Sequence, residues 1–416
     1  MRKIIMVLVL SIACLGMVYP QEYRTKALSP EINTIQVNRN GDWKEYPIME
    51  LNSPDIIRLN FDRISENSFD RLRYRILHCN ADWTRSSMSE IEYLEGFNDN
   101  LIEDYASSVN TTIGYTNFIL DIPNGDLRPK ISGNYVIEVY EEDNTDNVLL
   151  TACFMVLDPQ VAIGGNYTGN TLIDSNRAHQ QVSFTINHSQ LNIRDPYSDL
   201  KIFVRQNNRT DNQKTNIKPT YIQPGRLVYE QNRELIFEAG NEYRRFETVS
   251  SRYNGFRIAL NRYEHPYYYS WVVPDLIRAY TRYTYDEDQN GRFLILNAEG
   301  RESDTDADYF FVNLTLEAEN PFLENLYVNG NFTEYVFDDK YLMQYDYEKK
   351  VYYNTLMLKQ GSYNYQFLLD KGGKLTTSET EGNYYETENE YQILVYHRSP
   401  GQRYDSFVGY LKIASR

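Results

Sequence analysis

The chain has few of the residues that carry metal and thiol chemistry, since its 416 residues include only 5 histidines and 3 cysteines. Neither Cys79 nor Cys153 stands in a C-x-x-C spacing, so a redox or zinc role finds no support. Basic residues are also scarce, with 42 Lys and Arg against 58 Asp and Glu and a formal net charge of −16. Binding a phosphate backbone needs clustered Lys and Arg, and this balance therefore excludes nucleic acid as a partner.

Long apolar runs are missing after the first twenty residues, where no stretch approaches the roughly 18 apolar residues of a membrane-spanning helix. Residues 1–20 combine a short basic start, Arg2 and Lys3, with an apolar run to Ala13, which predicts a secretory signal peptide. An N-terminal anchor is the rival interpretation. Lipidation at Cys14, as in a lipoprotein, is a further alternative, although the residues before Cys14 lack the expected Leu.

An exported chain would enter a compartment that permits disulfides. Cys79 and Cys153 would then either form a bridge or remain two buried free thiols that behave as small apolar groups. Pairing cannot be deduced from sequence, and both alternatives stay open.

Catalytic signatures are absent as well. The sequence has no Ser/His/Asp order, no H-E-x-x-H helix, no phosphate-binding Gly loop and no paired carboxylates in a recognisable frame. The run from His78 to Trp83 holds a histidine, a thiol and a carboxylate, but neighbouring strand positions point to opposite faces. We interpret it as a strand end, with Trp83 filling a sandwich core and Asp82 binding a turn backbone. We expect no enzymatic activity and no cofactor.

Tyrosine is abundant, with 38 residues, and favours pleated, half-buried surfaces. Nearly every periodic segment alternates with period two, as in residues 55–61 and 135–140, with turn residues such as Asn124-Gly125 and Asn329-Gly330 between them. The best helical candidate, residues 88–105, is interrupted by Gly96 and holds at most one or two short turns. The sequence therefore predicts an all-β chain of tandem immunoglobulin-like or early-set β-sandwich domains.

We expect three units after the signal peptide. The predicted boundaries are 24–158 for an N-terminal β-sandwich, 160–300 for a middle β domain and 309–398 for a C-terminal early-set-like sandwich. The acidic stretch 301–308 reads as a linker, and residues 399–416 as a tail.

Two local patterns are candidate sites. Asp286, Asp288 and Asn290 place oxygen ligands at alternate positions before Gly291, as in the first half of a calcium loop. The position of the closing Glu is Asn297, so a hairpin turn is the alternative. The run Tyr267, Tyr268, Tyr269, Ser270 and Trp271 is either a partner contact or an edge strand, because Tyr and Trp anchor interfaces at low entropy cost.

The third unit also resembles glycogen-binding-type carbohydrate modules. It carries Asn329-Gly330-Asn331-Phe332 and then Gly361-Ser362-Tyr363-Asn364-Tyr365, with Tyr335 where a sugar-stacking Trp would help. This motivates an alternative function as a periplasmic or surface glycan-binding protein, which predicts coplanar aromatic side chains open to solvent. A cell-envelope hydrolase would be a third function, but the sequence nominates no acid and base for it.

A wider resemblance covers most of the chain after residue 20, in the combination of its motifs. The sequence resembles the plug protein family of the bacterial type IX secretion system in these runs: Leu59-Asn60-Phe61-Asp62, His78-Cys79-Asn80-Ala81-Asp82-Trp83, Glu92-Tyr93-Leu94-Glu95-Gly96-Phe97, Asn110-Thr111 with Tyr115, Ser132-Gly133-Asn134-Tyr135, His179-Gln180-Gln181-Val182, Gln206-Asn207-Asn208-Arg209, Gly240-Asn241-Glu242-Tyr243-Arg244-Arg245-Phe246 and residues 285–293.

The resemblance implies a non-enzymatic periplasmic protein of the Bacteroidetes group, peripheral to the outer membrane. It would dock on the outer-membrane translocon barrel and seal its periplasmic opening when no substrate is bound. The family supplies no catalytic residues to transfer, and its motifs do not show which face docks. Glycan binding remains the alternative.

Overall fold

Strands follow one another along almost the whole chain in the computed structural model, which describes residues 22–65, 71–300 and 302–414. The helical elements are single turns: α1 (Glu90–Tyr93), α2 (Pro196–Asp199), α3 (Ser303–Asp306), η1 (Arg233–Leu235) and η2 (Asn331–Thr333). Within these described ranges no helix has the length and apolar character needed to cross a membrane. The prediction of an all-β chain is confirmed. The predicted signal peptide, residues 1–20, lies outside the described residues.

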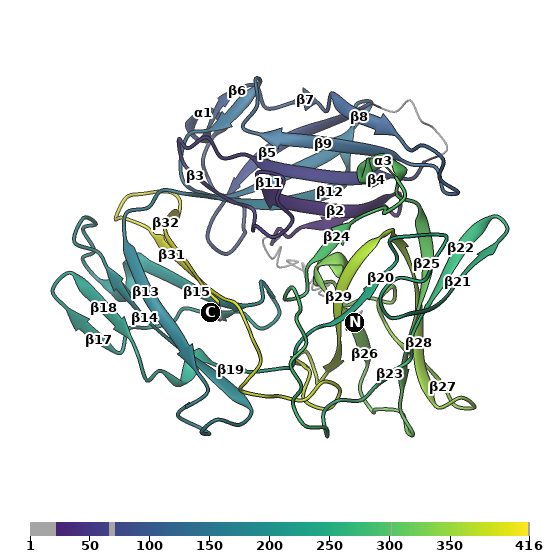
Figure 1. Ribbon diagram of the computed structural model, residues 1–416. Coiled ribbons are helices and arrows are strands. Elements are labelled where there is room, and N and C mark those ends of the chain that lie inside the picture. The colour runs from purple at the N-terminus through teal and green to yellow at the C-terminus, as the bar shows by residue number, and fades with distance from the viewer. Residues whose placement is uncertain (1–21, 66–70, 301, 415–416) are drawn as a thin grey trace, which may run out of the picture.

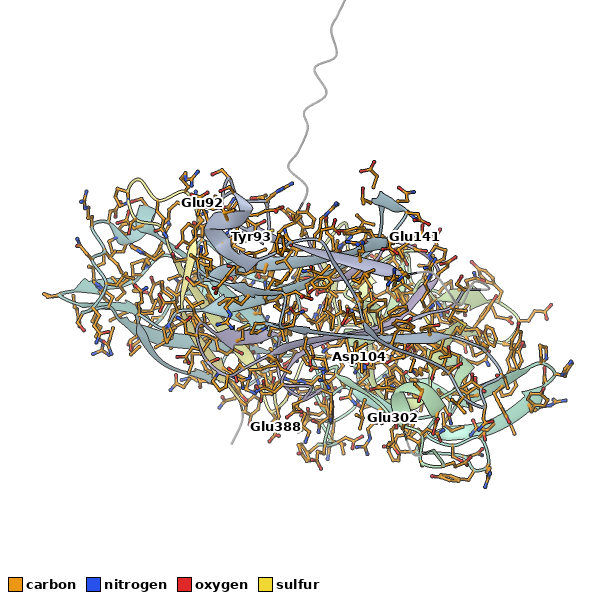
Figure 2. The ribbon with its side chains drawn as sticks, turned by 90° about the horizontal axis from the view of Figure 1, so that it is seen from above. Glu92, Tyr93, Asp104, Glu141, Glu302 and Glu388 are labelled. Carbon is orange, nitrogen blue, oxygen red and sulfur yellow. The ribbon has the colours of Figure 1, made fainter. Side chains whose placement is uncertain are left out.

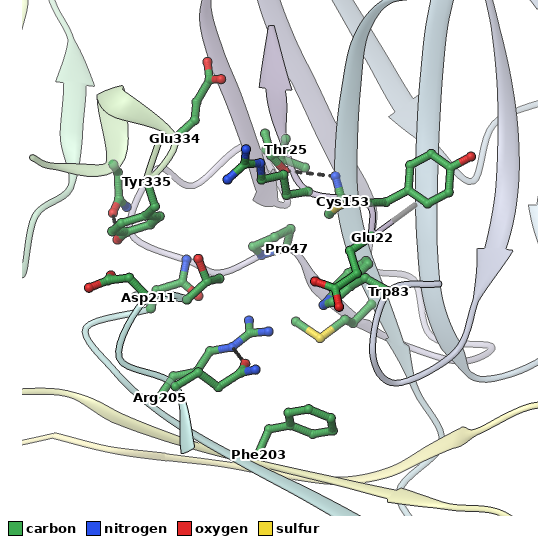
Figure 3. A pocket seen from close by; sticks show the side chains of 18 of the residues that line it. Glu22, Thr25, Pro47, Trp83, Cys153, Phe203, Arg205, Asp211, Glu334 and Tyr335 are labelled. Atoms are coloured by element: carbon green, nitrogen blue, oxygen red, sulfur yellow. Dashed lines mark hydrogen bonds between the residues drawn. The ribbon is translucent and has the colours of Figure 1, made fainter. Parts of the chain in front are cut away.

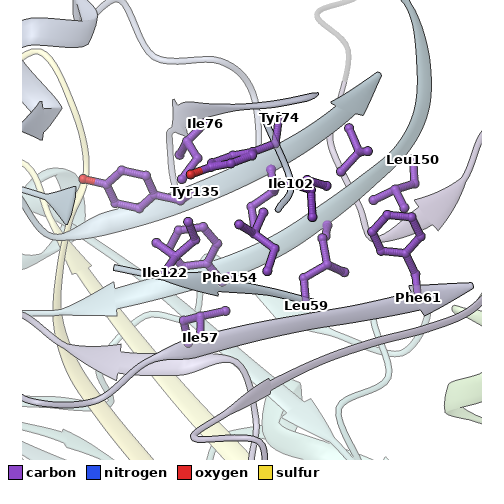
Figure 4. Packing of buried hydrophobic residues seen from close by; sticks show 14 of the residues in the cluster. Ile57, Leu59, Phe61, Tyr74, Ile76, Ile102, Ile122, Tyr135, Leu150 and Phe154 are labelled. Atoms are coloured by element: carbon purple, nitrogen blue, oxygen red, sulfur yellow. The ribbon is translucent and has the colours of Figure 1, made fainter. Parts of the chain in front are cut away.

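The first unit is a sandwich of two sheets whose apolar side chains meet in one core. One sheet holds β1 (Lys26–Ala27), β12 (Asn144–Leu157), β11 (Gly133–Glu141), β5 (Leu72–Cys79) and β7 (Asn100–Leu101), with β3 (Ile48–Glu50) on β12; the other holds β2 (Ile32–Arg39), β4 (Ile57–Arg63), β9 (Thr116–Ile122) and β8 (Asp104–Ser107). A small pair, β6 (Leu94–Gly96) and β10 (Leu127–Pro129), covers one end. Figure 4 shows Ile57, Leu59 and Phe61 of β4 facing Ile76 and Phe154 across the core, as the period-two pattern predicts.

The middle unit also packs two sheets face to face. The first holds β13 (Ala162–Thr168), β14 (His179–Asn187), β18 (Arg226–Tyr229) and β17 (Tyr221–Gln223), with β19 (Ile236–Glu238) on β14. The second holds β16 (Lys214–Thr215), β15 (Leu200–Gln206), β31 (Tyr391–His397) and β32 (Ser406–Ile413). Side chains of both sheets share one buried cluster that includes Phe184, Val204 and Val395.

The third unit contributes the remaining strands. One sheet is built on β29 (Gly361–Asp370), with β20 (Arg244–Glu247), β24 (Phe293–Ile295), β26 (Leu326–Asn329) and β30 (Leu375–Thr376) around it. The other runs β21 (Ile258–Glu264), β22 (Tyr267–Val272), β25 (Tyr309–Glu317), β28 (Val351–Lys359) and β27 (Gln344–Asp346), with β23 (Asp275–Leu276) on β25. Their inner faces form a second large core around Phe246, Phe310 and Phe367.

Strand pairing divides the chain differently from the predicted boundaries 160–300, 309–398 and 399–416. Residues 244–295, predicted for the middle domain, supply β20 to β24 of the third unit. β31 and β32 instead pair with β15 of the middle unit, so residues 399–416 include a core strand and are not a tail. Figure 1 shows β31 and β32 crossing back to β15 on the left. The third unit therefore interrupts the sequence of the middle unit.

The three units are joined by buried contacts. Between the first and middle units lies an apolar cluster of Ile48, Met155, Phe203, Leu394 and Phe407, together with Tyr46, Ala81 and Tyr396. The contact between the first and middle units is therefore largely apolar. Seen from above (Figure 2), the labelled acidic residues Glu92, Asp104, Glu141, Glu302 and Glu388 are spread along the molecule.

Candidate functional site

The predicted aromatic run forms β22, which pairs with β21 on one side and with β25 on the other. Tyr267, Tyr269 and Trp271 share one half-exposed face: the ring of Tyr269 stacks on that of Trp271 at 6.1 Å and on that of Phe311 at 5.3 Å. Tyr267 meets Phe311 edge-on, also at 5.3 Å. We call Tyr267, Tyr269, Trp271 and Phe311 the aromatic sheet face.

Tyr268 does not belong to that face. Its ring stacks on the buried Phe310 at 5.0 Å and packs against the core of the third unit. The run therefore points alternately to both faces, and three of its four predicted contact residues point outward. The hairpin of β21 and β22 extends beyond the rest of the unit in Figure 1. Its exposed Leu260 lies opposite Trp271, whereas its exposed Tyr263 lies opposite Tyr268 on the other face. Half-exposed aromatic side chains that lie together in this way are typical of contact sites.

The calcium-like turn is held together by its own backbone. Asp288 accepts hydrogen bonds from the backbone N–H of Asn290 at 2.8 Å and from that of Tyr243, while Asp286 is exposed. Burial raises the pKa of Asp288 to about 7. In the ranges that the structure describes, no three His, Cys, Asp or Glu side chains form a group able to hold a metal ion. This geometry is that of a turn.

The imidazole and the thiol of the run His78 to Trp83 are both buried. Burial lowers the pKa of His78 to about 4, and its Nδ1 lies 2.9 Å from the hydroxyl of Ser86. Cys79 and Cys153 are free and buried, and burial raises the pKa of Cys79 to about 12. Asp82 accepts the N–H of Thr84 at 3.2 Å, which confirms its predicted turn role.

Trp83 lies elsewhere than predicted. It has a positive φ of 63°, is only partly buried, and packs at the edge of the cluster between the first and middle units. Tyr335 also fails to form an open sugar platform: its hydroxyl donates to the carbonyl oxygen of Asn207 at 3.1 Å and contacts Asn331. Both residues line a cleft that the sequence did not predict.

This central cleft lies where the three units meet and has a volume of about 1070 Å³. Figure 3 shows side chains from each unit around it, among them Trp83, Arg205 and Tyr335. Its aromatic lining residues are Tyr23, Trp43, Trp83, Phe203, Phe293, Tyr335 and Phe337. Two of the three tryptophans of the chain therefore border one cavity.

Charged side chains in the cleft are mostly satisfied by partners within the protein. Arg292 pairs with Glu390 at 2.7 Å and Lys201 with Asp405 at 2.9 Å. Glu334 accepts the backbone N–H of Ala27 at 2.9 Å, and burial raises its pKa to about 7. Arg205 is different, because only its Nε is engaged, donating to Gln213 Oε1 at 2.5 Å. Burial lowers the pKa of Arg205.

Polar contacts also join the first unit to the third. Lys359 Nζ lies 2.7 Å from Asp62 Oδ2, and both side chains are almost completely buried. The hydroxyl of Tyr309 donates to the same carboxylate oxygen at 2.6 Å, and the backbone N–H of Thr112 donates to Asp308 at 2.8 Å. These bonds fix the two units against each other.

Comparison with known proteins gives a consistent result. Residues 32–158 match the family model described as the Type 9 secretion system plug protein 1st domain. A crystal structure of a hypothetical protein from Parabacteroides merdae is 43% identical, with a TM-score of 0.92 over 95% of this chain and 100% of that chain.

Two further solved structures have little similarity to this chain in sequence or in fold. The alkylpurine DNA glycosylase AlkC of Pseudomonas fluorescens, bound to DNA, is 8% identical over 30% of each chain, with a TM-score of 0.17. Dimeric latent PorU from Porphyromonas gingivalis is 12% identical over 93% of this chain and 34% of that chain, with a TM-score of 0.15. No curated protein matches the sequence.

Proposed function

We infer, because the chain belongs to the type IX secretion system plug protein family, that it docks on the outer-membrane translocon barrel and closes its periplasmic opening when no substrate is bound. Family membership connects the chain to secretion-system components of the cell envelope. The match of residues 32–158 is the observation that carries this proposal. The protein works by binding and shape, without catalysis.

The build of the molecule supports a sealing role. A plug must keep its shape against a wide opening, and the units here are joined by buried groups. Asp62 and Lys359 link the first unit to the third, and the apolar cluster around Phe203 and Phe407 links the first to the middle unit. If one unit moved away from another, the buried ion pair would lose its partner and the apolar side chains would be exposed to water, and both changes cost free energy.

We propose that the aromatic sheet face contacts the barrel. Tyr and Trp side chains give large contact areas with little loss of conformational freedom, and they are enriched at the centres of interfaces. The exposed edge strand β21 extends this surface with Leu260, which lies opposite Trp271. A contact of this kind can be released when cargo arrives, since it needs no covalent change.

The test is recovery of the partner from the native host. The protein is tagged at its C terminus, the outer membrane is solubilised gently, and co-purifying proteins are identified by mass. We expect one very large barrel protein without bound cargo. Recovery of the tagged protein alone, together with retention on a glucan column, would contradict the proposal and favour glycan binding.

Variants locate the contact. The triple substitution Tyr267→Ala, Tyr269→Ala and Trp271→Ala is expected to lower barrel recovery at least ~10-fold, because truncating a hot-spot Tyr or Trp at an interface costs about 2 kcal/mol or more. The matched control is Tyr221→Ala with Ile222→Ala, two exposed residues of β17 in the middle unit. Equal recovery with both variants would show that another face docks.

Salt dependence is a second readout of the same contact. At a net charge of −16, docking through a basic patch is not expected, and binding should weaken only modestly as salt rises. A steep loss of recovery between low and high salt would contradict an aromatic contact.

A further inference from the structure

The central cleft contains one buried cation without a counter-ion. Five arginines have less than a tenth of their surface exposed among the described residues: Arg63, Arg205, Arg209, Arg244 and Arg292. Four of them form ion pairs with Asp or Glu. Arg205, 7% exposed, has no carboxylate within ion-pair distance in the part of the chain that the structure describes.

The free part of Arg205 is its terminal pair of nitrogens. The Nε–H is used by Gln213, whereas neither terminal nitrogen has a hydrogen-bond partner among residues 22–65, 71–300 and 302–414. Arg205 follows Lys201 and Phe203 on the cleft side of β15, and all three line the cavity. Figure 3 shows the Arg205 guanidinium in the space between Pro47 and Phe203.

A guanidinium that keeps little contact with water and has no counter-ion is costly, and its terminal N–H groups match a carboxylate in a two-bond geometry. The cavity also holds the carboxylates of Glu22 and Asp211, and its apolar lining includes Phe203, Trp83 and Met155. We propose that the central cleft binds an organic carboxylate, whose anionic group sits on Arg205 and whose apolar body packs against these side chains.

The dimensions agree with such a ligand. The cavity of about 1070 Å³ is at the upper end of the range for small-molecule sites, and it also accommodates several residues of a peptide that ends in, or carries, a carboxylate. The lining also holds three large non-glycine residues with positive φ: Trp83, Glu334 and Tyr335. Backbone held in this region of φ is enriched at ligand sites.

The probe is 3-phenylpropionate, compared with its uncharged amide, on the purified full chain. Trp43 and Trp83 report on the cleft by fluorescence, and calorimetry gives the affinity. We expect saturable binding of the acid and roughly ten- to hundred-fold weaker binding of the amide, the range for losing a hydrogen-bonded charge. Arg205→Met is expected to lose the acid by a similar factor, with Arg205→Lys between.

A second variant guards against misfolding of Arg205→Met. Gln213→Glu places a carboxylate beside Arg205, so the guanidinium is neutralised from within while the side chain stays in place. It should fold and still lose the acid. Arg252→Met, whose side chain is 82% exposed, is the matched control and should bind as the original protein does.

Titration with a peptide distinguishes a small organic acid from the carboxylate end of a polypeptide as the ligand. A hexapeptide that ends in phenylalanine with a free carboxylate is titrated beside the small acid. Binding at least ten-fold tighter than 3-phenylpropionate would identify a chain terminus as the ligand, and equal or weaker binding a small acid. Equal binding of acid and amide, or an unchanged affinity in Gln213→Glu, would overturn the proposal. None of these results bears on docking to the barrel.

Discussion

The buried pair of Asp62 and Lys359 provides the sharpest test of how the first and third units are held together. The perturbation is Lys359→Met, which keeps the length of the side chain and removes the charge. It leaves Asp62 buried with two neutral donors, Tyr309 Oη at 2.6 Å and Asn117 Nδ2 at 2.8 Å. It also removes the bond from Nζ to the carbonyl oxygen of Asp304 and the contact with the Tyr115 ring, 4.1 Å away.

The expected loss is about 3–5 kcal/mol in the free energy of unfolding, the range for removing one partner of a fully buried ion pair. The double variant Asp62→Asn with Lys359→Met should recover most of it, because neither charge then remains buried. A double-mutant cycle isolates the interaction of the two side chains. Urea unfolding followed by tryptophan fluorescence measures each free energy, and limited proteolysis reports separation of the units.

The control is the same substitution near the other end of strand β28. Lys350 forms an ion pair with Glu319, and both side chains are more than half exposed. Exposed pairs contribute little, so Lys350→Met should unfold as the original protein does. The reasoning would be refuted if Lys359→Met cost no more than Lys350→Met, or if the double variant were as unstable as the sum of its single substitutions.

Three further predictions concern the pKa shifts and the chain end. Burial lowers the pKa of His78 to about 4, so as pH falls below 6.5 this histidine takes up a proton in the unfolded state before it does so in the folded state, and the protein loses stability. This contribution amounts to up to about 3 kcal/mol between pH 6.5 and 4. His78→Gln should abolish it, as measured by urea unfolding at each pH. Burial raises the pKa of Asp288 to about 7, so Asp288→Asn should stabilise the fold by up to about 4 kcal/mol at pH 8 and by progressively less toward pH 4. Calcium should leave the melting temperature of the original protein unchanged. A calcium-dependent rise in melting temperature that Asp288→Asn abolishes would instead support a calcium site. Deletion of residues 406–416 should yield insoluble protein, since Phe407 and Val408 are fully buried, and soluble, folded protein would show that β32 is dispensable.

Alternation alone located most strands, because it reports which side chains face a core. The alternating segment 135–140 lies within β11, and residues 88–105 contain only the four-residue helix α1. Alternation does not report which strand pairs with which. The stretch after Arg244 was therefore assigned to the wrong unit, although its β20 pairs with Tyr363 and Tyr365 far along the chain.

The aromatic run could be predicted from the sequence, whereas the central cleft could not. The aromatic run could be found because aromatic residues at consecutive strand positions must leave some rings outside, and Tyr269 and Trp271 are those rings. The cleft could not be found, because its members come from three units. An arginine at position 205 of an alternating strand predicts that this face of the strand points to solvent. In the structure the first unit packs over the face of β15 that carries Phe203 and Arg205, so that face lies inside the molecule.

The pairing of β31 with β15 imposes an order on how the units can fold during synthesis. Gln206 and Tyr391 are paired neighbours that lie 185 positions apart, so a chain that emerges from its N terminus can complete the first and third units before the middle one. Until residues 391–397 of β31 arrive, Ile202 and Val204 have no partner strand on that side, and contacts between such distant segments form slowly. A chain that ends before β31 thus carries an open sheet edge on β15, and an exposed edge of this kind is prone to pair with other chains.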